Sequence, residues 1–144
     1  MRKALVLFLA FLPAPAWAQD AAPGERAVLD AFFAAFNAHD VEAMTQYVTG
    51  DIEVVYLDDA GVADRSDGVD ALTVSMRGYF ESLPSARAEI VDVIIDGERL
   101  AVRERAFWST GEGEARSQTS LSVYRFEGGL IASVWYFPET RDTD

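Results

Sequence analysis

The chain has 144 residues, of which 24 are acidic and 12 are lysine or arginine, so its formal net charge is −12, and it contains no cysteine. The missing cysteines exclude disulfides, thiolate nucleophiles and zinc–thiolate sites, and the negative charge argues against binding to nucleic acid. A chain of this length buries one core, so we expect a single domain.

The first predicted element is a cleavable export signal. Arg2 and Lys3 precede an apolar run over residues 4–12, and an Ala-x-Ala cleavage pattern ends at Ala18. This run is too short for a membrane span, which needs about 20 residues. We therefore predict a signal peptide over residues 1–18 and a periplasmic or secreted product with no membrane segment. Loss of the two basic residues would change the net charge from −12 to −14.

Two helices are predicted at the start of the domain, after a flexible leader over residues 19–24. Apolar residues recur at helical spacing from Val28 to Phe36, which is typical of one buried helix face. The polar residues that follow end this helix, and Asp40 can cap a second helix over residues 41–47. We expect the two helices to meet at a tight corner.

A strand, a loop and a third helix are predicted next. Alternating apolar residues predict a strand over residues 52–57, and a polar segment over residues 58–67 predicts a loop. Apolar side chains at helical spacing predict a helix over residues 69–82, which Pro84 stops.

Four meandering strands are predicted after Pro84, because turn signals separate extended segments there. Asp96-Gly97 is a strong hairpin signal, and further glycine turns lie near Gly111 and Gly128. The strands are expected over residues 89–95, 98–108, 117–126 and 130–137. The domain is thus assigned to residues 25–138, with a flexible tail over residues 139–144.

Alternation within the second of these strands separates an apolar face from a basic one. If Asp96-Gly97 is a two-residue loop, Ile95 lies opposite Glu98, Val93 opposite Leu100, and Val91 opposite Val102. The apolar face is expected to be the concave one. It includes Glu104, whereas the other face carries Arg99, Arg103 and Arg105. A carboxylate with apolar neighbours has a raised pKa or a partner.

Five segments of the chain carry a resemblance to a known fold family. They are AFFAAFNAHDVEAM (31–44), GDIEVVY (50–56), SDGVDAL (66–72), IIDGERLAVR (94–103) and VYRFEGGLIASVWYF (123–137). Together with the element order, they resemble the nuclear transport factor 2-like superfamily and its SnoaL-like group, which includes ketosteroid isomerases. The resemblance implies an α+β fold, a cone-shaped barrel with three N-terminal helices packed on a curved antiparallel sheet. It does not imply one activity, because this fold hosts isomerases, dehydratases, cyclases, epoxide hydrolases and non-catalytic binders.

A cone of this kind encloses one pocket, whose lining follows from strand alternation and from the family motif. The predicted ligand-binding residues are Phe32, Tyr56, Leu72, Met76, Leu100, Val102, Glu104, Trp108, Ser122, Tyr124 and Tyr136. The set is mostly aromatic with a few polar tips, which is typical of sites for small apolar molecules.

The resemblance also allows the ketosteroid isomerase residues to be checked one by one. Its helix-one tyrosine falls on Phe32, its first-strand aspartate on Tyr56, and its later-strand aspartic acid on Ser122, so none is retained. We therefore expect no steroid isomerase activity. A different catalytic set remains open, with Glu104 as base and Tyr56 or Ser122 holding an oxyanion. A structural or ligand-orienting carboxylate is the commoner alternative.

No metal or cofactor is predicted. His39 is the only histidine, and its place in the corner between two helices predicts a solvated loop residue. The acidic segment from Asp58 to Asp70 lacks the ligand spacing of an EF-hand. Asp67 or Asp70 is expected instead to cap the third helix. Nucleotide-binding glycine patterns are also missing from the sequence.

An apolar band on the convex side of the predicted sheet favours a symmetric homodimer. The band comprises Phe107, Leu121, Val123, Trp135 and Phe137, more apolar surface than a monomer usually exposes. The resemblance supports this expectation, because family members commonly dimerise through the same surface.

Three functional hypotheses follow from the sequence. The first is an exported protein that binds a small apolar or aromatic molecule without catalysis. The second is a cofactor-independent isomerase, dehydratase or hydrolase with Glu104 as its acid/base residue. The third is an interaction module whose cavity is filled by its own side chains. An open cavity with a raised pKa at Glu104 would favour the enzyme.

Overall fold

The computed structural model describes residues 23–141 of the chain. The predicted signal peptide, its cleavage site and most of the predicted leader lie outside the described residues. Within them, no helix combines the length and the apolar character needed to cross a bilayer.

Three helices form one layer of the molecule: α1 (Pro23–Asn37), α2 (Val41–Thr45) and α3 (Val69–Ser82). The predicted cap of α2 is confirmed, because the Asp40 carboxylate accepts a hydrogen bond of 2.9 Å from the Ala43 amide. The predicted aspartate cap of α3 is wrong. Gly68 occupies that position with φ 91°, and its amide donates to the Ile52 carbonyl, so the chain enters the helix in a conformation suited to glycine.

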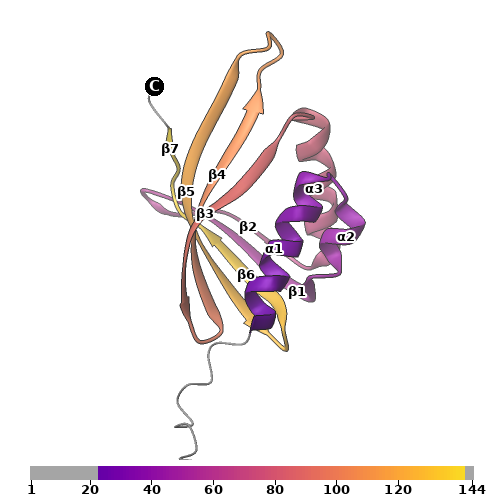
Figure 1. Cartoon of the computed structure of the whole chain (residues 1–144), viewed down its shortest axis with the longest axis vertical. Coiled ribbons are helices and arrows are strands. Elements are labelled where there is room, and N and C mark those ends of the chain that lie inside the picture. The colour runs from indigo at the N-terminus through magenta and orange to yellow at the C-terminus, as the bar shows by residue number, and fades with distance from the viewer. Residues whose placement is uncertain (1–22, 142–144) are drawn as a thin grey trace, which may run out of the picture.

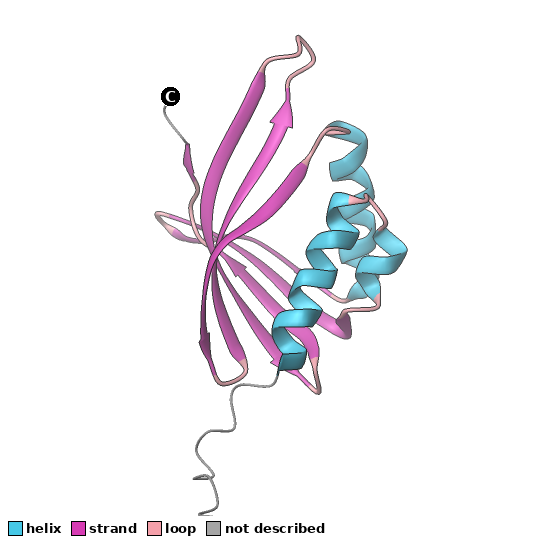
Figure 2. Ribbon diagram, in the orientation of Figure 1, coloured by secondary structure: helices cyan, strands magenta, loops and turns pink. Residues whose placement is uncertain are grey.

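A seven-stranded sheet forms the second layer. Its strands are β1 (Val48–Asp58), β2 (Gly61–Asp67), β3 (Arg87–Asp96), β4 (Arg99–Ser109), β5 (Ala115–Glu127), β6 (Leu130–Tyr136) and β7 (Thr140–Arg141). The spatial order is β2-β1-β6-β5-β4-β3, with β7 paired to β5. The predicted α+β class and the packing of three helices on a curved sheet are confirmed (Figures 1 and 2). The sheet is not wholly antiparallel, because β1 and β6 run parallel.

The acidic segment predicted as a loop is instead the edge strand β2. It pairs with β1 in an antiparallel hairpin that places Asp64 opposite Tyr56. Its residues are almost all exposed, so no apolar alternation marks it in the sequence. Two residues of the predicted tail, Thr140 and Arg141, pair with β5 as strand β7.

The β3–β4 hairpin turns one residue later than expected. Asp96 pairs with Arg99, so the two-residue loop is Gly97-Glu98, with Gly97 at φ 56°. Glycine in the first loop position is the pattern of a type II′ turn. The resulting register pairs Val93 with Val102 and differs from the expected one by two residues, so the inward-facing set of β4 is unchanged.

A bulge in β3 changes the partners near Glu104. The register shifts between Ile90 and Asp92, and Ile90 becomes the partner of Glu104. Val91, expected inside opposite Val102, lies in the bulge and is 40 % exposed. Bulges of this kind redirect side chains locally, and they are frequent beside functional sites.

The helices cover only part of the sheet. They pack over one face, while the hairpin of β4 and β5 extends beyond them at one end (Figure 1). The core between the layers includes Leu29 and Met44 from the helices and Tyr124, Phe126 and Ile131 from the sheet. The covered part of the concave face is therefore where a cavity can be enclosed.

Candidate functional site

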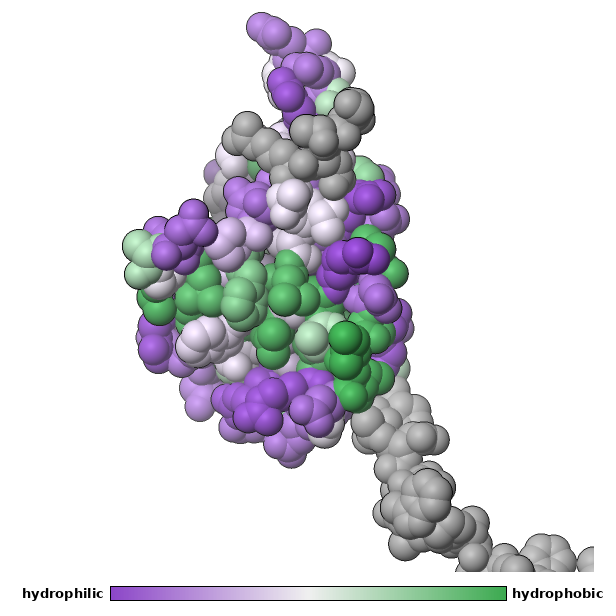
Figure 3. Space-filling model, turned by 90° about the vertical axis from the view of Figure 1, so that its left-hand side faces the viewer, coloured by the Kyte–Doolittle hydropathy of each residue, from purple (hydrophilic) through white to green (hydrophobic). Residues whose placement is uncertain are grey.

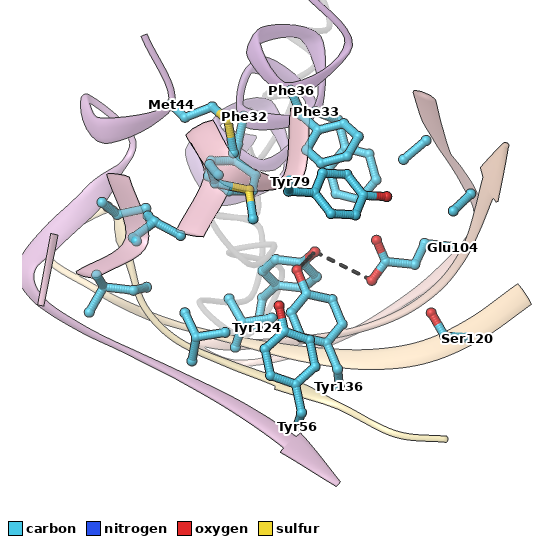
Figure 4. A pocket seen from close by; sticks show the side chains of 18 of the residues that line it. Phe32, Phe33, Phe36, Met44, Tyr56, Tyr79, Glu104, Ser120, Tyr124 and Tyr136 are labelled. Atoms are coloured by element: carbon cyan, nitrogen blue, oxygen red, sulfur yellow. Dashed lines mark hydrogen bonds between the residues drawn. The ribbon is translucent and has the colours of Figure 1, made fainter. Parts of the chain in front are cut away.

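A cavity of about 200 Å³ lies between the helices and the concave face of the sheet. On the helical side, α1 contributes Phe32, Phe33 and Phe36, and α3 contributes Tyr79 (Figure 4). Met76 of α3 also lines the cavity. These residues belong to the apolar stripes that make both helices amphipathic, so the same pattern that folds the helices also lines the cavity.

The sheet supplies most of the polar groups of the cavity. Tyr56 on β1, Tyr124 on β5 and Tyr136 on β6 form one aromatic wall, with the rings of Tyr56 and Tyr136 stacked at 5.0 Å. Glu104 on β4 and Ser120 on β5 lie at the end of this wall (Figure 4). Side chains alternate along each strand, so these residues share one face of the sheet.

Glu104 is the charged residue of the cavity, and its side chain is held by hydroxyl groups. One carboxylate oxygen, Oε1, accepts a short hydrogen bond from the Ser122 hydroxyl and a second, at 3.4 Å, from the Tyr124 hydroxyl. Tyr124 in turn lies 3.5 Å from the hydroxyl of Tyr136. Among the hydrogen bonds of the described residues, none reaches the other oxygen, Oε2.

The environment of Glu104 raises the pKa of its carboxyl group to near neutral pH. Only 9 % of the residue is exposed, and this burial raises its pKa to about 7, although the hydrogen bonds from Ser122 and Tyr124 oppose the rise. Burial also raises the pKa of Tyr124 and of Tyr136 well above the usual value, so both phenols stay protonated at neutral pH and can donate. A carboxyl group with a pKa near 7 can both accept and release a proton there.

The structure divides the predicted lining residues into three groups. Those that line the cavity are Phe32, Tyr56, Leu72, Met76, Glu104, Tyr124 and Tyr136. Leu100, Val102 and Ser122 are fully buried beneath the lining, and the Ser122 hydroxyl donates a hydrogen bond to the cavity residue Glu104. Trp108 does not line the cavity. It is half-buried near the end of β4, opposite Arg116, where the hairpin extends past the helices.

Several cavity residues were not in the predicted set. They are Phe33, Phe36, Met44, Val48, Ile52, Val54, Tyr79, Ala88, Ala106, Gln118, Ser120 and Val134. The helical ones lie on the apolar stripes recognised in the sequence, and the strand residues follow the same alternation. Sequence patterns show which residues point toward the interior. The packing of the helices on the sheet determines which of those residues line the cavity.

His39 is not the solvated loop residue that the sequence predicts. Its ring stacks on Phe80 with the centroids 4.2 Å apart, and its Nε2 lies 2.8 Å from the Ala86 carbonyl oxygen. Its φ of 55° places the backbone in the left-handed region. His39 therefore ties the α1–α2 corner to the segment before β3, and it is not among the residues that line the cavity.

A model of the SnoaL-like domain family matches residues 29–134. The chain belongs to the SnoaL-like domain family. The resemblance found in the sequence is thereby confirmed. Among curated proteins, no significant match to this SnoaL-like chain is found.

Solved structures share this SnoaL-like fold. Wild-type IdmH from Streptomyces antibioticus, provisionally named a polyketide cyclase, is 17 % identical with a TM-score of 0.69, over 80 % of this chain and 91 % of IdmH. A provisionally named SnoaL-like polyketide cyclase from Jannaschia sp. CCS1 is 13 % identical with a TM-score of 0.70, over 83 % and 90 %. An uncharacterized cystatin fold protein from Novosphingobium aromaticivorans is 24 % identical with a TM-score of 0.65, over 79 % and 97 %. At these identities the likeness shows the fold alone.

Proposed function

We propose that this SnoaL-like protein binds a small, largely apolar molecule in its cavity and acts on it without a cofactor, with Glu104 as the acid/base residue. The observation that carries the proposal is the position of Glu104. Its carboxyl group lines an apolar cavity, with Oε1 held by two hydroxyl donors and Oε2 free of hydrogen bonds from the described residues.

The geometry supports a proton transfer through Oε2. Ser122 and Tyr124 fix the carboxyl group through Oε1, so the side chain does not have to be ordered when a molecule binds. The carboxyl group lies between Tyr124 on one side and Tyr79 on the other (Figure 4). A molecule in the cavity can therefore reach the oxygen that the protein leaves unbonded.

The absence of a cationic partner favours catalysis over a purely structural role. Buried carboxylates in a structural role are usually paired with a positive charge, because desolvation of an isolated charge is costly. No ion pair of Glu104 is present among the described residues, and the arginines of β4 lie on the opposite face. Its pKa of about 7 is that of an effective acid/base catalyst near neutral pH. These features favour the enzyme over the non-catalytic binder.

Deuterium exchange tests this proposal directly. Neutral ring ketones such as acetophenone and cyclohexanone exchange the hydrogens next to the carbonyl when a base removes them, and proton NMR in D₂O measures the rate. We expect the protein to accelerate exchange at about pH 8, and we expect Glu104→Gln to lower the rate at least about 100-fold. The rate should rise with pH through about 7, because the ionised carboxylate is the base.

Glu89→Gln is the matched control, because Glu89 is an exposed carboxylate on the neighbouring strand and lies opposite Arg105. Its exchange rate should equal that of the unchanged protein. Saturable binding of the ketones without any accelerated exchange would contradict the enzyme and leave the non-catalytic binder. No saturable binding of either ketone would contradict the proposed pocket function altogether.

We also propose that the protein is exported and works as a homodimer. The basic start and apolar run of the N-terminal segment support export, and mass spectrometry of the protein from its host should find a chain that begins at Gln19. A chain that retains residues 1–18 would contradict this.

The homodimer proposal rests on the convex face of the sheet. An apolar band crosses this face between hydrophilic margins (Figure 3), and Phe107, Leu121, Trp135 and Phe137 are each 36–46 % exposed there. Light scattering at micromolar concentration should give twice the chain mass. Leu121→Lys should give the monomer mass, whereas Val74→Lys, at an exposed position on α3, should not. A monomer mass for the unchanged protein would contradict the proposal.

A further inference from the structure

We infer that Tyr79 is the second polar contact of the cavity and donates a hydrogen bond to the oxygen of a neutral, single-ring ligand that lies against Glu104. This inference rests on the proposed function, because it takes the same cavity as the binding site. The inference extends the proposed function in two ways. It assigns a binding role to Tyr79, which is not among the site residues predicted from the sequence, and it specifies the size of the ligand.

Tyr79 presents an unused donor to the cavity from the helical side. Its ring lies 5.9 Å from that of Phe36 and 5.7 Å from that of Phe80, so the side chain is held in a cluster of aromatic rings. Its hydroxyl makes no hydrogen bond with any described residue. Tyr124, by contrast, already uses its hydroxyl on Glu104. A donor that faces an apolar cavity without a partner is costly unless a ligand or water satisfies it.

The Tyr79 hydroxyl and the Glu104 carboxyl group approach each other from opposite layers of the fold. Tyr79 comes from α3 and Glu104 from β4, and the hydroxyl points toward the carboxyl group across the cavity (Figure 4). Burial and the nearby Glu104 raise the pKa of Tyr79, so its phenol remains a donor at neutral pH. A ligand between the two layers therefore meets a donor on one side and an acceptor on the other.

These two groups define the polar chemistry of the ligand. A donor fixed at Tyr79 requires an acceptor such as a carbonyl oxygen, which an ammonium group lacks. An anionic ligand is disfavoured, because it would be buried beside Glu104 without a cation. The remaining class is a neutral molecule that carries a carbonyl or a similar oxygen.

The volume of the cavity fits a ligand of one ring. A cavity of about 150 Å³ holds benzene, so about 200 Å³ accommodates one ring with a short substituent. Ala88 and Ala106 are cross-strand partners whose small side chains line the cavity beside Glu104, and they leave space there for the substituent. A molecule with four fused rings exceeds this volume.

Carbon-13 NMR of acetophenone labelled at the carbonyl carbon tests the inference. A hydrogen bond to the carbonyl oxygen moves this signal downfield, so the bound signal should lie downfield in the unchanged protein and lose that displacement in Tyr79→Phe. We expect the same variant to weaken binding roughly threefold to tenfold, because one neutral hydrogen bond is lost. Tyr47→Phe is the matched control, because Tyr47 is a partly buried tyrosine that packs against the core without lining the cavity, so removal of its hydroxyl should leave the bound signal unchanged.

Each result either supports or overturns the inference. An equal carbon shift and affinity in Tyr79→Phe would overturn the role of Tyr79, even if Glu104→Gln abolished deuterium exchange and so supported the proposed function. Tight binding of a four-ring ketone, or no saturable binding of acetophenone, would overturn the size class. Tyrosine-to-phenylalanine changes keep the ring, and equal thermal midpoints for the two variants would exclude misfolding as the cause of a lost shift.

Discussion

The concave and convex faces of β4 and β5 belong to the same strands but provide opposite environments. On β4, Leu100, Val102 and Glu104 face the helices and are buried, while Arg99 and Arg103, at alternate positions of the strand, face outward and are exposed. Strand alternation assigns each residue to a face. The environment of each face then depends on the helices, because they exclude water from the concave face and leave the convex face exposed.

A comparison of two carboxylates shows the consequence. Glu104 is enclosed under the helices, where hydroxyl groups are its partners and burial raises its pKa to about 7. Glu127, at the end of β5, is exposed and forms an ion pair with Arg125 at the surface. Water screens the second carboxylate and not the first, so only Glu104 depends on hydroxyl groups of the protein for its polar contacts.

The largest difference between the faces should appear when matched leucines are truncated. Leu100→Ala should lower the free energy of unfolding by about 2–5 kcal/mol, because it opens a cavity in the core. Leu121→Ala, on the convex face and 46 % exposed in the single chain, should lower the free energy of unfolding of the monomer by less than about 1 kcal/mol, measured at a concentration too low for the proposed dimer. Urea denaturation measures both. Equal losses would mean that the two faces are equally buried in solution.

A pH titration of stability should reveal the enclosed carboxyl group. The folded protein holds the proton of Glu104 up to about 7, whereas the unfolded chain releases it near 4.5. The free energy of unfolding should therefore fall between these two pH values by about 3 kcal/mol relative to Glu104→Gln, and then remain level. Urea denaturation at several pH values checks this, and parallel curves for the two proteins would contradict the raised pKa.

The hydroxyl that anchors Glu104 should have an intermediate effect. Ser122→Ala removes a hydrogen bond that favours the ionised form, so the pKa of Glu104 should rise further and the pH profile of deuterium exchange should move to higher pH. The stability loss should be about 1–3 kcal/mol, because a buried polar partner disappears. Carbon-13 titration of the Glu104 carboxyl measures the shift, and a lowered pKa would contradict the proposed anchor.

The smallest effect is expected for an ion pair on the convex side. Arg125→Ala removes the pair with Glu127, and the free energy of unfolding should change by less than about 1 kcal/mol. Even this change should decrease at high salt, because exposed charges are screened. A larger loss that persists in high salt would show that this part of the convex face is buried in solution, as a dimer interface would be.

The resemblance to the nuclear transport factor 2-like superfamily supplied the α+β class. The sequence by itself determined the three helices, the strands after Pro84 and the inward side of β4. These follow from local periodicity, which a single chain displays without knowledge of its neighbours. Glu104 could be identified as unusual for the same reason, because it interrupts an otherwise apolar face. The hairpin loop at Gly97-Glu98 was misplaced by one residue without changing that face.

Only the tertiary structure decided which inward residues border the cavity. Trp108 shares a face with Glu104 but lies where the hairpin passes beyond the helices, while Tyr79 reaches the cavity from α3. The polar edge strand β2 also needed its partner β1 to form, because it has no apolar side of its own. The physical reason is the same for Trp108 and Tyr79. A face is a property of the backbone period, whereas an enclosed cavity depends on how far a second layer covers that face.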